Sequence, residues 1–237
     1  MPEEPSSYST RWSVIAQLHD GKPNDSWDWF IRRYRGYVAA VLRHLGFRAE
    51  EIDAATEEFW SYLYRSRAVE RADRDGRFRA FLSGVVHNYA RSWRRDQAPR
   101  SQPAGEPADP DALPDLRPTL ELDLWAAQIL HLGLARLGRD HADDERALRW
   151  FYGLPGEVGG DATARVRATE IARRLGCTAN AMHQTLFRAR NRLRDCIERE
   201  VSTTVGSSPD LREEMMLLIG VVERVRPGLL NADAGAP

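Results

Sequence analysis

Cysteine and lysine are scarce in this 237-residue chain, and it has no long apolar run. The two cysteines, Cys177 and Cys196, have no Cys or His partner at a metal-ligand spacing, so we expect reduced thiols rather than a disulfide or a metal site. No segment approaches the ~20 apolar residues of a membrane span. The first residues also lack the basic start and apolar core of a secretory signal. We therefore expect a cytoplasmic protein that does not insert into a membrane.

Positive charge comes almost entirely from arginine, because Lys22 is the single lysine among 34 basic residues. There are 35 acidic residues, and the formal net charge is −1. This balance argues against a protein that coats nucleic acid indiscriminately, but it allows basic patches offset by acidic faces. Between Arg165 and Arg199 there are nine arginines and three acids, a local excess that is typical of phosphate contact.

Signals of catalysis are missing from the sequence. The six histidines are scattered without a metal-ligand spacing, and no GxSxG, HExxH or phosphate-loop motif occurs. The adjacent carboxylates Glu50-Glu51 and Asp143-Asp144 lie in strings of acids that are typical of solvated surface. The sequence therefore favours a protein that is not an enzyme and has no cofactor and no metal ion.

Apolar periodicity predicts an all-α protein, because apolar residues recur every three to four positions and no segment alternates like a strand. Helices are expected over residues 10–18, 26–45, 50–65, 77–96, 120–137 and 143–152. The fourth of these is expected either as one helix or as a helix pair broken near Ser83-Gly84, since glycine weakens a helix interior.

Composition indicates two small helical domains. Six prolines and no helical periodicity predict a semi-flexible linker over residues 98–118. It joins a domain at residues 10–97 to a domain at residues 119–201. Residues 202–237 are an extension with one amphipathic helix, expected over residues 210–225, which either packs back on a domain or docks on another protein.

The segment from Arg167 to Arg194 predicts a short helix, a tight turn and a longer helix. Gly176 tolerates the left-handed conformation of a helix end, and Thr178 can cap the second helix. Apolar residues then follow at steps of four, three and four: Met182, Leu186, Ala189 and Leu193. This is the helix-turn-helix pattern, whose second helix can lie in the major groove of DNA. The alternative is an arginine-rich, solvated helix in an ordinary bundle.

Basic and aromatic residues interleave over residues 77–96, RFRAFLSGVVHNYARSWRRD. Such a surface can track phosphates and stack unpaired bases. The alternative is that the aromatic residues are all core and the arginines only solvate the surface. We expect a core position for Phe78, Leu82, Val85 and Val86. We expect nucleic-acid contact at Asn88, Arg91, Arg94 and Arg95.

Taken together and in this order, these elements resemble a sigma factor of the sigma-70 family, of the two-domain extracytoplasmic-function (ECF) type. The resemblance covers most of residues 10–201. WDWFIRRYRGYVAAVLRHLGF and AEEIDAATEEFWSYLYR are similar to helices of sigma region 2, GRFRAFLSGVVHNYARSWRR to the segment that opens the −10 element, and residues 120–200 to region 4. The resemblance implies a promoter-specificity factor that binds core RNA polymerase, recognises −35 duplex DNA and captures the melted −10 element to initiate transcription.

The resemblance also assigns residues to three contacts. The family's Asp-x-x-Gln-Glu-x-Phe pattern, with Thr56 at the glutamine position, implies docking on core RNA polymerase by Asp53, Glu57 and Phe59. Contact with the −10 promoter DNA is implied for Phe81, Asn88, Arg91, Arg94 and Arg95. Contact with the −35 DNA is implied for His183, Gln184, Phe187, Arg188 and Arg190.

The partners implied by the resemblance are core RNA polymerase, promoter DNA and, as is common in the family, an anti-sigma factor. The main alternative is a helix-turn-helix transcriptional regulator that binds duplex operator DNA and does not engage RNA polymerase. The two functions differ in one testable property, which is binding to the polymerase.

Overall fold

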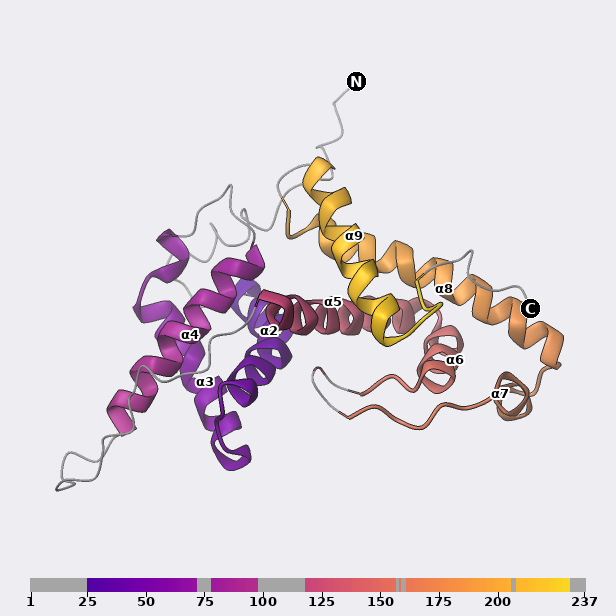
Figure 1. Cartoon of the computed structure of the whole chain (residues 1–237), viewed down its shortest axis with the longest axis horizontal. Helices are drawn as coiled ribbons and strands as arrows, with labels where there is room; N and C mark the ends of the chain where they lie inside the picture. The colour runs from indigo at the N-terminus through magenta and orange to yellow at the C-terminus, as the bar shows by residue number, and fades with distance from the viewer. Residues whose placement is uncertain are drawn as a thin grey trace. The chain divides into compact units, whose positions relative to one another are not determined.

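The computed structural model describes residues 25–71, 78–97, 118–156, 158, 161–205 and 208–230. Over these residues the chain forms eight α-helices and one short 3-10 helix, with no β-strand (Figure 1). The all-α class expected from the sequence is confirmed. The helix expected over residues 10–18 lies outside the described residues, as does all of the expected linker except Pro118.

The described helices fall into two compact units, which divide between Glu121 and Leu122. The N-terminal unit contains α2 (Asp25–His44), α3 (Ala49–Arg65), the 3-10 helix η2 (Ala68–Arg71) and α4 (Phe78–Gln97). The division lies inside α5 (Pro118–Asp140), and the C-terminal unit continues with α6 (Ala142–Tyr152), α7 (Ala168–Leu175), α8 (Ala179–Ser202) and α9 (Ser208–Val225). The helices expected within the described residues are therefore confirmed, with ends that differ by at most three residues.

The three α-helices of the N-terminal unit each pack against the other two (Figure 1). Their core is aromatic: the ring of Phe30 meets the rings of Trp60 and Phe78 edge-on, at centroid distances of 6.0 and 6.1 Å. The hydroxyl of Tyr89 in α4 donates a hydrogen bond of 2.8 Å to the carbonyl oxygen of Ala55 in α3. Burial of this hydroxyl raises the pKa of Tyr89. Ring packing and this bond together hold α4 in register with α3.

Helix α4 is continuous through Ser83 and Gly84, so the alternative of a broken helix pair does not occur. The physical reason is its apolar stripe, which runs through the glycine without interruption. The residues expected in the core are all at most 8% exposed: Phe78, Leu82, Val85 and Val86. Their contacts with α2 and α3 outweigh the ~1 kcal/mol that a glycine costs inside a helix.

In the C-terminal unit, α6, α7 and α8 pack against one another, and α9 packs against α8 (Figure 1). Two ion pairs reinforce this arrangement: Arg192 of α8 meets Asp144 of α6 at 2.5 Å, and Arg136 of α5 meets the buried Glu200 of α8 at 2.6 Å. Helix α8 is therefore held from several sides, which gives it a defined outward face.

The segment after α8 belongs to the same compact unit. Helix α9 ends at Val225, and Leu229 and Leu230 then bury their side chains, at 0% and 1% exposed. The carboxylate of Glu223 accepts hydrogen bonds from the backbone N–H groups of Gly228 and Leu230, at 2.6 and 2.7 Å. The expectation that this helix packs back on a domain is confirmed.

Candidate nucleic-acid interface

The helix-turn-helix expected from the sequence is present in the C-terminal unit. Helix α7 ends at Leu175, and Gly176 caps it in the left-handed conformation (φ 67°, ψ 32°) that an L side chain disfavours. The hydroxyl oxygen of Thr178 accepts a hydrogen bond of 3.2 Å from the N–H of Ala181 and caps the start of α8. Gly176 and Thr178 therefore have the roles expected from the sequence: Gly176 caps the end of α7, and Thr178 caps the start of α8.

The inner face of α8 is the apolar stripe predicted from its spacing. Its four expected members are at most 3% exposed: Met182, Leu186, Ala189 and Leu193. Helix α7 contributes Ile171, which is fully buried, and Leu175, which is half-buried. The opposite side of α8 is consequently turned away from the helices that pack against its stripe.

Four of the five residues expected to contact −35 DNA are exposed on the first turns of α8: His183, Gln184, Phe187 and Arg188. Their spacing of i, i+1, i+4 and i+5 puts them on one face of the helix. Phe187 is 47% exposed, which is unusual for a large apolar side chain. The face thus combines hydrogen-bonding groups with a flat apolar ring, and these are the groups that read base edges and thymine methyls in a major groove. We call these four residues the α8 face.

Arg190, the fifth of these residues, has a different environment. Its Nη1 donates a hydrogen bond of 3.3 Å to the carbonyl oxygen of Gly228, and its Nε donates one of 3.2 Å to the carbonyl oxygen of Leu186. The side chain is half-buried against the turn that follows α9. Arg190 therefore links α8 to the segment after α9 and is not part of the α8 face.

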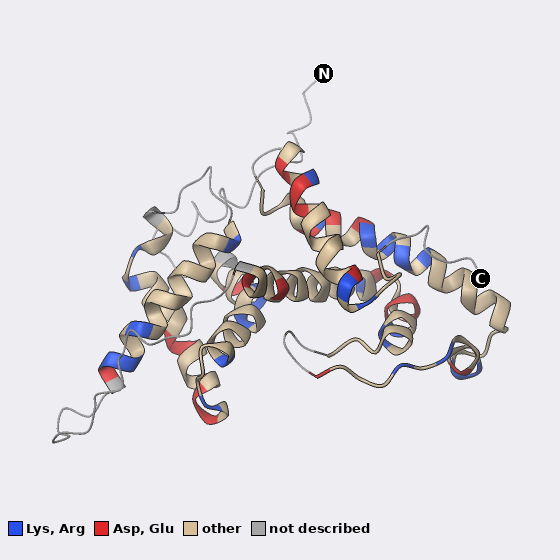
Figure 2. Cartoon of the chain, in the orientation of Figure 1, with Lys and Arg blue, Asp and Glu red and all other residues tan. Residues whose placement is uncertain are grey.

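Carboxylates neutralise several arginines near the helix-turn-helix. Glu170 accepts hydrogen bonds from Arg173 and Arg174 at 2.7 to 2.9 Å, and these bonds lower the pKa of Glu170 to about 2. Arg188 and Arg194, by contrast, have no carboxylate partner in the part of the chain that the structure describes. In Figure 2 the N-terminal end of α8 carries no blue band. The positive charge available for phosphate contact is therefore smaller than the nine arginines suggest.

Helix α4 carries the second expected interface, for −10 DNA. Phe81, Asn88 and Arg95 follow one another at steps of seven residues, so they share one face of the helix. Asn88 and Arg95 are exposed, while Phe81 and Arg91 are half-buried. The C-terminal end of α4 is coloured largely blue in Figure 2. We call Phe81, Asn88, Arg91 and Arg95 the α4 face.

Arg94 was also expected to contact DNA, but its guanidinium is engaged inside the N-terminal unit. Its Nη2 donates a hydrogen bond to the carbonyl oxygen of Leu45, just after α2, and its guanidinium carbon lies 5.6 Å from the ring centroid of Phe47. A cation at the C-terminal end of a helix is stabilised by the helix dipole. Arg94 therefore ties α4 to α2 and does not lie on the α4 face.

The residues expected to dock on RNA polymerase are not brought together on one surface. Asp53 and Glu57 are exposed one turn apart on α3, but Phe59 is fully buried and packs against Trp60 and Tyr89. Phe59 is thus a core residue beneath the acidic side chains. Thr56 is also buried, and its hydroxyl has no hydrogen-bond partner among the described residues.

An arginine that the sequence did not single out completes this acidic site. Arg35 of α2 forms ion pairs with both Asp53 and Glu57, at 3.5 Å to Asp53. The pairing is exposed, so it contributes little to stability, but it offsets one of the two negative charges of Asp53 and Glu57. The signal that would have found Arg35 is its place in an arginine-rich stretch of α2, although its partner helix cannot be read from that stretch.

No group of three or more His, Cys, Asp and Glu side chains among the described residues is arranged to hold a metal ion. Cys177 is exposed and Cys196 half-buried, both are free thiols, and burial raises the pKa of Cys196. None of the helices described is long and apolar enough to cross a membrane.

Comparisons of the chain with protein-family models, with curated proteins and with solved structures found no match. The case for a function therefore rests on the residues and on their geometry.

Proposed function

We propose that this chain is a promoter-specificity (sigma) factor that binds core RNA polymerase, contacts −35 duplex DNA through α8 and captures melted −10 bases on α4. The observation that carries the proposal is the helix-turn-helix with its exposed α8 face, accompanied in the other unit by the exposed Asn88 and Arg95 of α4. The proposed chain has no active site of its own and acts by directing the polymerase to a promoter.

On the −35 element, the first turns of α8 enter the major groove. Gln184 can pair with the N6 and N7 of adenine, and Arg188 with the O6 and N7 of guanine. Phe187 offers an apolar surface to a thymine methyl group. Each good bidentate pair contributes ~1–3 kcal/mol of discrimination against the wrong base, so two such residues suffice for a strong preference.

On the −10 element, the α4 face receives a base that has left the duplex. Unstacking a base costs a few kcal/mol, and hydrogen bonds and aromatic stacking in a receiving site offset that cost. Asn88 supplies donors and acceptors, Phe81 a half-exposed ring, and Arg95 a charge for the phosphate.

The decisive experiment combines purified full-length chain, core RNA polymerase and promoter fragments. The proposal predicts that the chain co-purifies with core polymerase and gives run-off transcripts from a subset of genomic fragments. Arg188→Ala is expected to reduce transcription at least fivefold, in line with the ~1–3 kcal/mol of one base contact. Arg199→Ala, which removes an exposed arginine from the far end of the same helix, is the matched control and should leave transcription within twofold.

The −10 role is tested with Asn88→Ala, scored by permanganate reactivity of unpaired thymines. Loss of opening with retained polymerase binding supports the role of the α4 face. Normal opening in both Asn88→Ala and Arg95→Ala overturns it. Neither substitution alters a buried group, so folding is expected to be preserved.

A regulator that does not engage polymerase is the second candidate, and one observation favours it. The ion pairs of Arg35 with Asp53 and Glu57 already neutralise part of the acidic surface on α3. This function predicts that the free protein binds duplex DNA through α8 and that no polymerase is recovered with it. The same pull-down therefore decides between the two candidates.

A further inference from the structure

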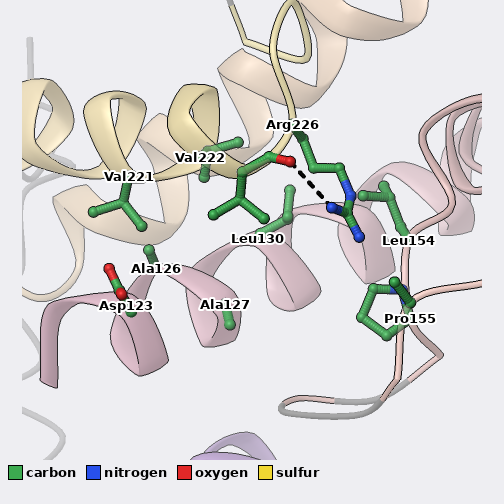
Figure 3. Close-up of a pocket in the computed structure, with 11 residues that line it drawn as sticks. Asp123, Ala126, Ala127, Leu130, Leu154, Pro155, Val221, Val222 and Arg226 are labelled. Carbon is green, nitrogen blue, oxygen red and sulfur yellow. Dashed lines mark hydrogen bonds between the residues drawn. The ribbon is translucent and has the colours of Figure 1, made fainter. Parts of the chain in front are cut away.

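An apolar cavity of about 250 Å³ lies within the C-terminal unit, and DNA binding makes no use of it (Figure 3). Its walls come from the first half of α5, the loop after α6 and the end of α9. The apolar side chains that form the walls include Ala126, Ala127, Leu130, Leu154, Val221 and Val222. A cavity of this kind favours an apolar body over water, because water finds few hydrogen-bond partners in it.

Two charged residues, Asp123 and Arg226, also line the cavity, and their environments differ. The carboxylate of Asp123 is paired with Arg224, so its charge is neutralised. Arg226 donates only to carbonyl oxygens, from Nη2 to Gly153 at 3.3 Å and from Nη1 to Val225 at 3.0 Å. It has no carboxylate partner among the described residues, and its buried Nε has no hydrogen-bond partner there.

Arg226 therefore places an uncompensated positive charge at one end of a largely apolar space, in which the other charged residue, Asp123, is paired with Arg224. In Figure 3 its side chain reaches from the end of α9 toward Leu154 and Pro155, beside the apolar walls. A guanidinium has five N–H donors and pairs with a carboxylate through two parallel hydrogen bonds. The uncompensated charge and the spare donors favour an anionic head on any molecule that enters the cavity.

We infer that this cavity binds a small amphipathic carboxylate, with its apolar body between α5 and α9 and its carboxylate on Arg226. The volume sets the size of the body. It lies between the ~150 Å³ that accommodates benzene and the ~300 Å³ at which sites for drug-sized ligands begin. A molecule of roughly ten non-hydrogen atoms fits that interval.

Octanoate is the probe, and 1-octanol is its uncharged counterpart with the same chain length. Titration calorimetry on the full-length protein is expected to give at least tenfold tighter binding of octanoate than of octanol, because one charge-assisted pair separates them. Arg226→Met is expected to reduce the affinity for octanoate to that for octanol. Arg212→Met removes an exposed arginine from α9, outside the cavity, and should change neither affinity.

A second variant tests the location without touching Arg226. Ala127 lines the cavity and is half-exposed, so Ala127→Phe fills the space without disturbing the core. We expect this variant to lose both octanoate and octanol while its thermal unfolding stays like that of the parent. If Arg226→Met fails to fold, two other measurements test the inference. They are ligand binding by Ala127→Phe and the ratio of the parent protein's affinities for octanoate and octanol.

Four results would overturn the inference. Absence of octanoate binding at millimolar concentration rejects the site. Equal affinity for octanoate and octanol rejects the anionic head group, as does unchanged octanoate binding by a folded Arg226→Met. Unchanged octanoate binding by Ala127→Phe rejects the location. No readout involves transcription, so these results are independent of the function proposed for the whole chain.

Discussion

Arg94 donates a hydrogen bond from its Nη2 to the carbonyl oxygen of Leu45, a residue 49 positions earlier in the chain. The bond satisfies a carbonyl that the end of α2 leaves without a helical partner. It also places a cation against the ring of Phe47. An arginine in a basic, aromatic helix thus holds two helices together.

Replacing Arg94 is therefore expected to affect stability more than DNA binding. Arg94→Ala should lower the free energy of unfolding by about 1.5–3 kcal/mol, the range for a hydrogen bond to a charged group. Its neighbour Arg95 is exposed, and Arg95→Ala should change stability by less than ~0.5 kcal/mol while weakening DNA binding. Urea unfolding of the two variants measures the difference, and equal effects on stability would contradict the role assigned to Arg94.

Gly153 and Gly176 form a matched pair of left-handed glycines. Both have positive φ, 62° and 67°, but a Cβ on Gly153 would lie 2.3 Å from the carbonyl oxygen of Thr163, whereas one on Gly176 would meet nothing within 4 Å. Gly176→Ala should cost only the ~1–2 kcal/mol of the left-handed conformation. Gly153→Ala should cost clearly more, because the backbone must also move. Melting temperatures of the two variants test this order, and a reversed order would refute the close packing at Gly153.

Glu170 links the stability of α7 to pH. Hydrogen bonds from Arg173 and Arg174 lower its pKa from 4.5 to about 2. Because the folded-state pKa lies below the unfolded value, the stabilisation is complete above about pH 4.5 and is lost as the pH falls toward 2. A carbon-detected NMR titration of the Glu170 carboxyl should give a midpoint near 2. Glu170→Gln should remove this part of the acid sensitivity, and a midpoint near 4.5 in the parent would show that the ion pairs do not form.

Leu229 and Met216 test whether the last described residues stabilise the C-terminal unit. Leu229 is fully buried, whereas Met216 on α9 is 67% exposed. Leu229→Ala should lower the free energy of unfolding by ~2–5 kcal/mol, as is usual for a buried leucine. Met216→Ala should change it by less than ~0.5 kcal/mol. Chemical denaturation distinguishes them, and a negligible effect of Leu229→Ala would mean that this segment is not part of the folded unit.

Local patterns in the sequence were sufficient to predict the helices and the helix-turn-helix. The reason is that a buried stripe repeats with the period of the helix, so the stripe of Met182, Leu186 and Leu193 can be read without a partner. The turn depends on Gly176 and Thr178, whose backbone preferences are intrinsic to the residue. The residues of the α8 face were named by the family resemblance, which also included Arg190; the stripe itself indicated only which side of α8 is turned away from the core.

The residues that sequence patterns misplaced have partners far away in the chain. Arg94 donates a hydrogen bond to the carbonyl oxygen of Leu45, just after α2, and Arg190 donates one to that of Gly228, 38 residues later. Phe59, for which the resemblance implies docking on RNA polymerase, is buried and packs against Tyr89 of α4. Periodicity reports which face of a helix is apolar, but it does not report which neighbour a long polar side chain will reach. Arg226 and the cavity were missed for the same reason, since the walls come from segments about 100 residues apart.

The carbonyl oxygen of Gly228 accepts hydrogen bonds from the Tyr152 hydroxyl at 2.5 Å and from Arg190 at 3.3 Å. This one carbonyl oxygen therefore links the segment after α9 to both α6 and α8. A fragment expressed for crystallisation or NMR should therefore extend beyond Leu230. A stop codon after Val201 would remove both hydrogen bonds and expose the apolar surface of α8 that α9 covers. An affinity tag should be fused at a position where it does not disturb these two hydrogen bonds.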